Sequence, residues 1–304
     1  MAFDISRFYQ DLDACYGNHD NAATEAFLKK SRDVADRAGA PMPVNTGCPS
    51  CVTPLEPNWA YVSVCNEMAC FYRGLSRFSE SLEVFELAQK ELESLYQQRT
   101  TEYATVLLNK AGTYRLMGEL DQALKYFRKA ADIFEQHPES PQTTLAGLYN
   151  NIGLVYLDQR KPQEALTCFA GAMNALQYLE NAIVETGTTW NNIAAAYNLL
   201  DNTKEAWDAA DHAAAILGAL DDGCNPHYPA ALNTRGILKY RAGDYQSALE
   251  DFEEALEKIK LVYGENVEYA RGCRNCAAVC LALDDETAAA DWEQKADSIE
   301  KCNR

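Results

Sequence analysis

Apolar and polar positions in residues 149–172 follow the period of two short amphipathic helices joined by a tight turn. The first helix is marked by the run from Tyr149 to Tyr156, and the second by Ala165, Phe169 and Ala172. Apolar side chains spaced three and four residues apart lie on one face of a helix, so each helix has a face to bury. The pattern returns along most of the chain, which predicts a repetitive, all-helical protein.

Small residues at fixed intervals define the repeat. The small residue in the middle of each first helix is its reference position, and successive reference positions are 41 or 42 residues apart: Ala69, Ala111, Gly153, Ala194, Gly236 and Ala277. Two further small columns follow: Ser81, Ala123, Ala165, Ala206, Ala248 and Ala289, then Ala88, Ala130, Ala172, Ala213, Ala255 and Ala296. An aromatic column lies between them: Phe85, Phe127, Phe169 and Phe252, with Ala210 and Glu293 as exceptions. Antiparallel helices approach closely only where side chains are small, so each pair packs tightly and then stacks on its neighbours.

These columns resemble the small, small, aromatic, small signature of the tetratricopeptide repeat family, in six successive units from Trp59 to the C-terminus. The period exceeds the usual 34 residues of that family. It is similar to the extended repeats of kinesin light chains, and so is the connector from Tyr263 to Asn266. The resemblance implies a right-handed α-solenoid of about seven antiparallel helix pairs. It also implies a protein that binds another protein or a peptide.

The chain divides into three parts on this interpretation. Residues 1–38 are expected to form a degenerate helical hairpin that caps the array. Residues 39–57 are rich in proline and cysteine, so they are expected to form a loop. Residues 58–304 are expected to hold six repeats and a C-terminal capping helix.

Two neighbouring polar columns lie two and three residues before the reference position. In the resembled family this part of the first helix faces the concave wall. The asparagines placed there are Asn66, Asn109, Asn150, Asn151, Asn191, Asn192, Asn233 and Asn275, with Asn198 further along. Because each amide both donates and accepts, such a row can hold the backbone of an extended peptide. The alternative is that the asparagines bond to carbonyl groups between neighbouring helices and fix their stacking.

Arginines share the predicted wall: Arg73, Arg115, Arg241, Arg271 and Arg274, with Tyr240 beside them. They are expected to select side chains of the bound segment, and could hold a carboxylate through forked contacts. The alternative is that they are solvated or paired with nearby Asp and Glu. The carboxylate clamp by which related repeats capture chaperone tails is not matched, because Leu108 and Gly112 stand at two of its positions.

Charge narrows the classes of partner. The chain has 27 basic and 45 acidic residues, a net charge of −18, which disfavours nucleic acid and anionic membranes as partners. No apolar run is long enough to span a membrane, and no signal peptide is recognisable at Met1. The eleven cysteines, an odd number, suggest reduced thiols and hence a cytoplasmic location. The sequence does not indicate an oligomeric state.

Candidate chemistry is sparse. Cys48 and Cys51 have the spacing of half a zinc or redox site, although zinc needs four ligands. No catalytic constellation or cofactor motif is recognised, so we expect a non-enzymatic scaffold or adaptor without a cofactor. A peptide-sensing regulator that docks on a partner is the alternative, and a zinc or thiol protein built on Cys48 and Cys51 is a third hypothesis.

Overall fold

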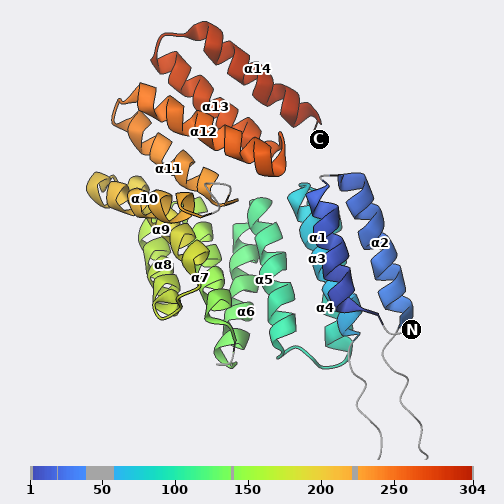
Figure 1. The fold of residues 1–304 in the computed structure, drawn as a ribbon. Helices are drawn as coiled ribbons and strands as arrows, with labels where there is room; N and C mark the ends of the chain where they lie inside the picture. Colours follow the sequence, from blue (N-terminus) through green and yellow to red (C-terminus); the bar gives the residue numbers. More distant parts are fainter. Residues whose placement is uncertain (1–2, 19, 39–57, 138–139, 221–224, 303–304) are drawn as a thin grey trace, which may run out of the picture. The chain divides into compact units, whose positions relative to one another are not determined.

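The structure is a computed structural model that describes residues 3–18, 20–38, 58–137, 140–220 and 225–302 (Figure 1). These residues form fourteen α-helices and no strand. The helices are α1 (Ile5–Gly17), α2 (Asn21–Ala38), α3 (Trp59–Gly74), α4 (Phe78–Ser94), α5 (Thr101–Leu116), α6 (Leu120–Glu135), α7 (Gln142–Asp158), α8 (Pro162–Leu176), α9 (Ile183–Leu199), α10 (Thr203–Gly218), α11 (Tyr228–Arg241), α12 (Tyr245–Tyr263), α13 (Val267–Ala282) and α14 (Glu286–Cys302). The predicted loop at 39–57, with Cys48 and Cys51, lies outside the described residues.

The helices pack in consecutive pairs within two compact units, Met1–Ser140 and Pro141–Arg304. In the first unit α1 packs on α2, α3 on α4 and α5 on α6, and α2 and α4 each contact the next pair. The second unit repeats this order from α7 to α14. First helices also meet directly, α3 with α5 in the first unit, and α7 with α9 and α9 with α11 in the second. The predicted all-α solenoid of helix pairs is therefore confirmed.

Each predicted reference position lies inside a first helix and is buried. The fit is tightest at two glycines. A Cβ atom at Gly153 would lie 2.3 Å from the ring of Phe169, and one at Gly236 would lie 2.7 Å from the ring of Phe252. Both phenylalanines belong to the aromatic column and are almost fully buried. The small and aromatic columns therefore interlock across the two helices of a pair.

The turn inside each of the six later pairs has one recurring geometry. The residue seven positions after the reference has a positive φ in every pair: Ser76, Gly118, Arg160, Asp201, Gly243 and Asp284. The N–H of the next residue then donates to a carbonyl five residues earlier, at 2.8–3.0 Å in all six pairs. This left-handed residue with a long backward hydrogen bond is a Schellman motif, which ends a helix.

The hairpin α1–α2 is joined to the first full pair by an ionic cluster. Glu25 of α2 accepts a hydrogen bond from Arg77 at 2.6 Å and one from Tyr72 at 3.2 Å. These bonds, with one from Lys29, lower the pKa of Glu25 to about 2, the Arg77 bond having the largest effect. The carboxylate therefore stays charged at neutral pH and holds α2 against the turn between α3 and α4.

None of the described helices is long and apolar enough to cross a membrane.

The left-handed position gives the first prediction. Arg160→Gly should raise the free energy of unfolding by about 1 kcal/mol, because a residue with a Cβ is strained there and glycine is not. Gly118→Ala should lower it by a similar amount. Urea denaturation followed by circular dichroism measures both changes. A destabilised Arg160→Gly variant would contradict the assigned turn geometry.

Candidate functional site

The sequence-predicted binding residues all lie on first helices, and each unit presents its own set. The first unit carries Asn66 and Arg73 on α3, and Asn109 and Arg115 on α5. The second carries Asn150 and Asn151 on α7, Asn191, Asn192 and Asn198 on α9, Asn233, Tyr240 and Arg241 on α11, and Arg271, Arg274 and Asn275 on α13. We call the surface formed by these sides of α7, α9, α11 and α13 the first-helix face of the second unit.

Asparagines from successive repeats bond to one another through their side chains. The Nδ2 of Asn109 donates to the Oδ1 of Asn66 at 3.0 Å. The same bond joins Asn192 to Asn150 at 3.2 Å and Asn275 to Asn233 at 3.0 Å. In each case the donor lies two residues before its reference position, and the acceptor lies three before that of the preceding repeat. We call each such pair a rung.

The rungs connect neighbouring first helices. Asn150 and Asn192 are only 8% and 7% exposed, and Asn150 also donates to the hydroxyl of Thr189 at 2.8 Å. The amide of Asn151 is bound to the carbonyl of Gly147, one turn earlier in the same helix, at 2.9 Å. These bonds fit the alternative in which the asparagines fix stacking, although the rung acceptors are side-chain oxygens rather than the backbone carbonyls we expected.

Within the second unit, one of the three contacts between repeats lacks its rung. Thr234 of α11 stands at the donor position, and its hydroxyl donates to the carbonyl of Ala230 in its own helix at 3.0 Å. The matching acceptor, the Oδ1 of Asn191 on α9, is buried and has no hydrogen-bond partner among the described residues. The substitution of threonine for asparagine explains this unsatisfied oxygen, because the shorter side chain bonds locally instead.

Two of the predicted arginines donate hydrogen bonds to other groups of the protein. Arg73 of one repeat donates to the backbone carbonyl of Asn109 in the next repeat at 3.0 Å. Arg241 donates to the carbonyl of Asn198 at 2.7 Å and also binds Asp201. Both arginines therefore join neighbouring repeats, as the rungs do.

The two arginines of α13 pair with carboxylates of their own repeat. Arg271 bonds to Glu268 at 2.8 Å in the same helix. Arg274 bonds to Asp297 at 3.0 Å and contacts Glu300, both on α14. This agrees with the alternative in which the arginines are paired with acidic neighbours. Arg115 lies in the last turn of α5.

Apolar side chains are exposed beside the rungs of the second unit. Leu199, Ile237 and Tyr240 are 37–39% exposed, and Leu281 is 56% exposed. Ile237 and Tyr240 follow Asn233 by four and seven residues, which places all three on one side of α11. A small pocket of about 120 Å³ lies nearby, lined by residues that include Asn198, Leu238 and Arg241. Only Tyr240 among the exposed four was predicted, although the helical spacing from the asparagines pointed to the others.

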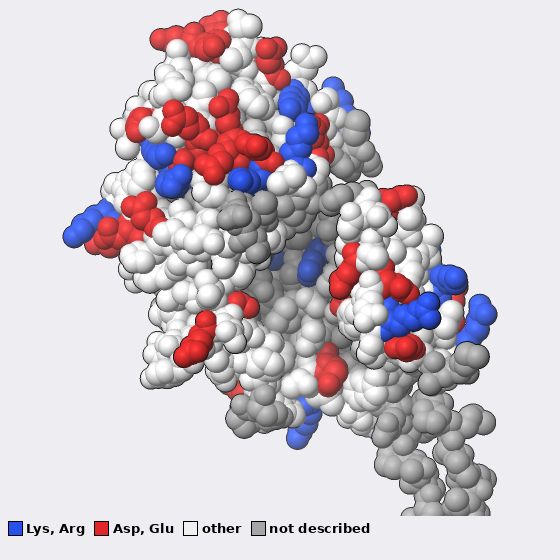
Figure 2. Space-filling model, in the orientation of Figure 1, with Lys and Arg blue, Asp and Glu red and all other residues white. Residues whose placement is uncertain are grey.

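Few charges lie on two of the four helices that form the first-helix face of the second unit. Helices α7 and α9 contain only two charged residues, Asp158 and Glu185, in a chain of net charge −18. Acidic side chains instead gather over the C-terminal helices of this unit (Figure 2). The cations on α11 and α13 are paired with carboxylates of the protein, so the face presents amides and partly exposed apolar side chains that are suited to contact with another polypeptide.

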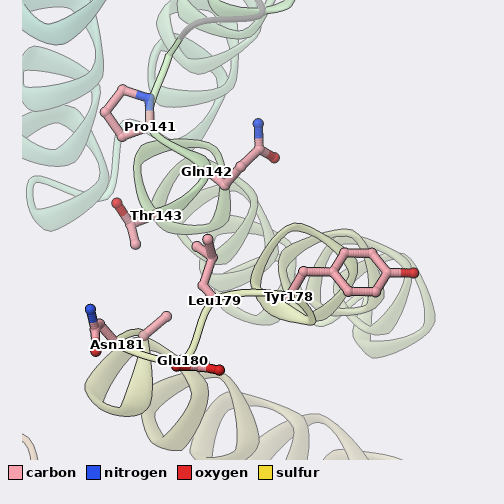
Figure 3. A pocket seen from close by; sticks show the side chains of 8 residues that line it. Pro141, Gln142, Thr143, Tyr178, Leu179, Glu180 and Asn181 are labelled. Carbon is pink, nitrogen blue, oxygen red and sulfur yellow. The ribbon is translucent and has the colours of Figure 1, made fainter.

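A larger pocket lies at the N-terminal end of α7. Its volume is about 490 Å³, and it lies between the start of that helix and the connection from α8 to α9 (Figure 3). Leu179 points toward Gln142 and Thr143, whereas Tyr178 points away from them and is 86% exposed. The sequence reasoning did not identify this pocket, because none of the repeat columns passes through it.

The cysteines of α3 and α13 are buried or half-buried in the packing of the helices. Burial raises the pKa of Cys65 to about 12 and that of Cys70 to about 11, so both are protonated at neutral pH. The buried thiols of α13, among them Cys276, have a raised pKa for the same reason. The described part of the chain contains no group of three or more His, Cys, Asp or Glu side chains that could hold a metal ion.

The sequence of this chain is similar to a known repeat family and to known proteins. Models of the tetratricopeptide repeat match residues 104–137, 145–177 and 228–296. Protein KINESIN LIGHT CHAIN-RELATED 2 of Arabidopsis thaliana is 29% identical over 168 residues, which are 55% of this chain and 24% of that protein. Response regulator aspartate phosphatase E of Bacillus subtilis (strain 168) is 29% identical over 98 residues, 32% of this chain and 25% of that protein. The chain thus spans about a quarter of the length of these curated relatives.

A solved structure has the same fold. NprR in complex with its cognate peptide NprX is similar with a TM-score of 0.59 and 18% identity, over 78% of this chain and 68% of that one. At this level of identity the similarity concerns the fold alone.

The missing rung gives a prediction. Thr234→Asn should raise the free energy of unfolding by about 1 kcal/mol, because the new amide can donate to the buried Oδ1 of Asn191. Thr and Asn have similar helix propensities, so the change isolates the hydrogen bond. The reciprocal control, Asn275→Thr, removes an existing rung and should lower the free energy by about 1–3 kcal/mol. Urea denaturation measures both, and a neutral or destabilising Thr234→Asn would show that rungs do not support the stack.

Proposed function

We propose that this protein is a non-enzymatic scaffold that binds a segment of another protein. The premise is that the chain belongs to the tetratricopeptide repeat family, with repeats like those of kinesin light chains. The binding surface in this proposal is the first-helix face of the second unit, which would form the inner, concave wall of the array. The observation that carries the proposal is the exposure of Leu199, Ile237, Tyr240 and Leu281 beside the rungs.

The rungs and the exposed side chains have different roles in this proposal. Asparagine pairs such as Asn192 with Asn150 hold the first helices at a fixed spacing, so the wall is already formed before the partner arrives. Preorganisation of this kind lowers the entropy lost on binding. The partner is then contacted by the apolar side chains and by polar groups at their edge, among them Asn198 and Arg241 in the small pocket.

A second candidate is a peptide-sensing regulator that docks on a partner protein. It is favoured by the similarity to Response regulator aspartate phosphatase E and by the fold shared with NprR, which was solved with its cognate peptide. Both candidates use the same surface, and they differ in whether the bound chain is a free peptide or part of a protein.

Site-specific cross-linking tests the proposal. Tyr240→p-benzoylphenylalanine, expressed in the native cell and irradiated, should yield a covalent adduct with a partner, because the side chain is exposed on the proposed surface. The matched control is the same replacement at Tyr178, which is more exposed and stands in the connection from α8 to α9, outside the helices that form this face. Mass spectrometry of the adduct separates a bound protein from a free peptide. Adducts at position 178 with none at position 240 would contradict the proposed surface.

A further inference from the structure

Three neighbouring first helices contribute apolar side chains to one stripe. Tyr240 and Ile237 stand on α11, Leu281 on α13 and Leu199 on α9. Helix α13 is joined to α11 by the rung from Asn275 to Asn233, and α11 is joined to α9 by the contacts of Arg241 with Asn198. The stripe is therefore held on a connected surface, and it crosses from one repeat to the next.

Carboxylates lie in the turns that follow the three helices of this stripe. Leu199, Tyr240 and Leu281 each lie in or next to the last turn of their helix, and the turns that follow are acidic. Residues 199–205, 241–247 and 281–287 contain six carboxylates, all exposed, against two cations, Lys204 and Arg241. The carboxylates are Asp201, Glu205, Asp244, Asp284, Asp285 and Glu286, of which Asp201 is paired with Arg241.

The cations of α11 and α13 are already paired with carboxylates of the protein. Arg241 binds Asp201 and the carbonyl of Asn198, so its guanidinium is committed to the protein's own groups. Arg274 is likewise bound to carboxylates of α14. An acidic segment would therefore meet more repulsion than attraction here, and a second copy of this chain would bring its own net charge of −18.

We infer that the partner segment carries apolar side chains flanked by lysine or arginine. This inference rests on the proposed function and names the chemical class of its partner. The apolar side chains pack on Ile237, Tyr240 and Leu281, and the basic ones reach the carboxylates of the adjoining turns. Complementary charge of this kind speeds association and rejects acidic competitors.

Synthetic peptides provide the test. Three fluorescent peptides of equal length are titrated with the full chain at physiological ionic strength, and anisotropy reports binding: one alternates leucine with lysine, one leucine with glutamate, and one serine with lysine. The leucine–lysine peptide should bind at least about tenfold more tightly than either of the others, because only it satisfies both the stripe and the carboxylates. Equal binding of the serine–lysine peptide would show non-specific charge attraction and overturn the inference.

Paired variants assign the binding to the stripe and its carboxylates. Ile237→Ser with Leu281→Ser should weaken the leucine–lysine complex about tenfold. Asp284→Asn with Asp285→Asn should weaken it less and make it less sensitive to salt, and asparagine at 285 can still cap α14. The matched controls on α12, Leu261→Ser at a 63% exposed side chain and Glu257→Gln at an exposed one, should leave the affinity unchanged. Controls that weaken binding as much as the test variants would overturn the inference.

The outcomes separate this inference from the proposed function. If the leucine–glutamate peptide binds best and the variant with serine at 237 and 281 weakens it, the surface binds a segment of the opposite charge and only the inference fails. If that variant changes no peptide's affinity while its thermal melting is unaltered, the proposed surface fails as well.

Discussion

The structure depends on how closely the two helices of each pair approach. At Gly153 and Gly236 the partner helix places a phenylalanine ring where a Cβ would otherwise stand, at 2.3 Å and 2.7 Å. The other four reference positions are alanines that are fully buried. Because packing at this distance leaves no room for larger side chains, the small columns fix the geometry of the pair. The turn then repeats with the same period in all six pairs, and the three rungs use the same two positions of the repeat.

Stacking then determines which polar groups meet. Rung asparagines on successive first helices come within hydrogen-bond distance because each repeat presents the same two positions to its neighbour. Each rung joins an amide hydrogen of one asparagine to the amide oxygen of another, so its hydrogen bond contributes to the stacking of the repeats. The side chains left exposed between them, such as Ile237 and Leu281, are the ones that a partner can reach.

The helix pairs could be predicted from the sequence because the residues that pack them recur at fixed positions of each repeat. Periodic alanines and phenylalanines predicted the pairs. The left-handed turn position has no such constant side chain, since it is glycine at Gly118 and Gly243 but Ser76 and Arg160 in other pairs. The site was less predictable. An asparagine amide can serve a neighbour or a ligand equally well, and only its distance to the next repeat shows that Asn109 reaches Asn66. Arg274 likewise turned out to face α14, because its carboxylate partners come from a helix about twenty residues further along. The pocket beside Leu179 lies in a connection, where no column exists to reveal it.

Two glycines of one helix test the central claim most directly. Gly153 and Gly147 both lie inside α7, but a Cβ at Gly147 would meet nothing within 4 Å. We predict that Gly147→Ala raises the free energy of unfolding by about 0.5–1 kcal/mol through helix propensity alone. Gly153→Ala should lower it by about 1–3 kcal/mol, because the new methyl group displaces the ring of Phe169. If both variants are stabilised equally in urea denaturation, close approach at the reference position does not set the packing of the repeat.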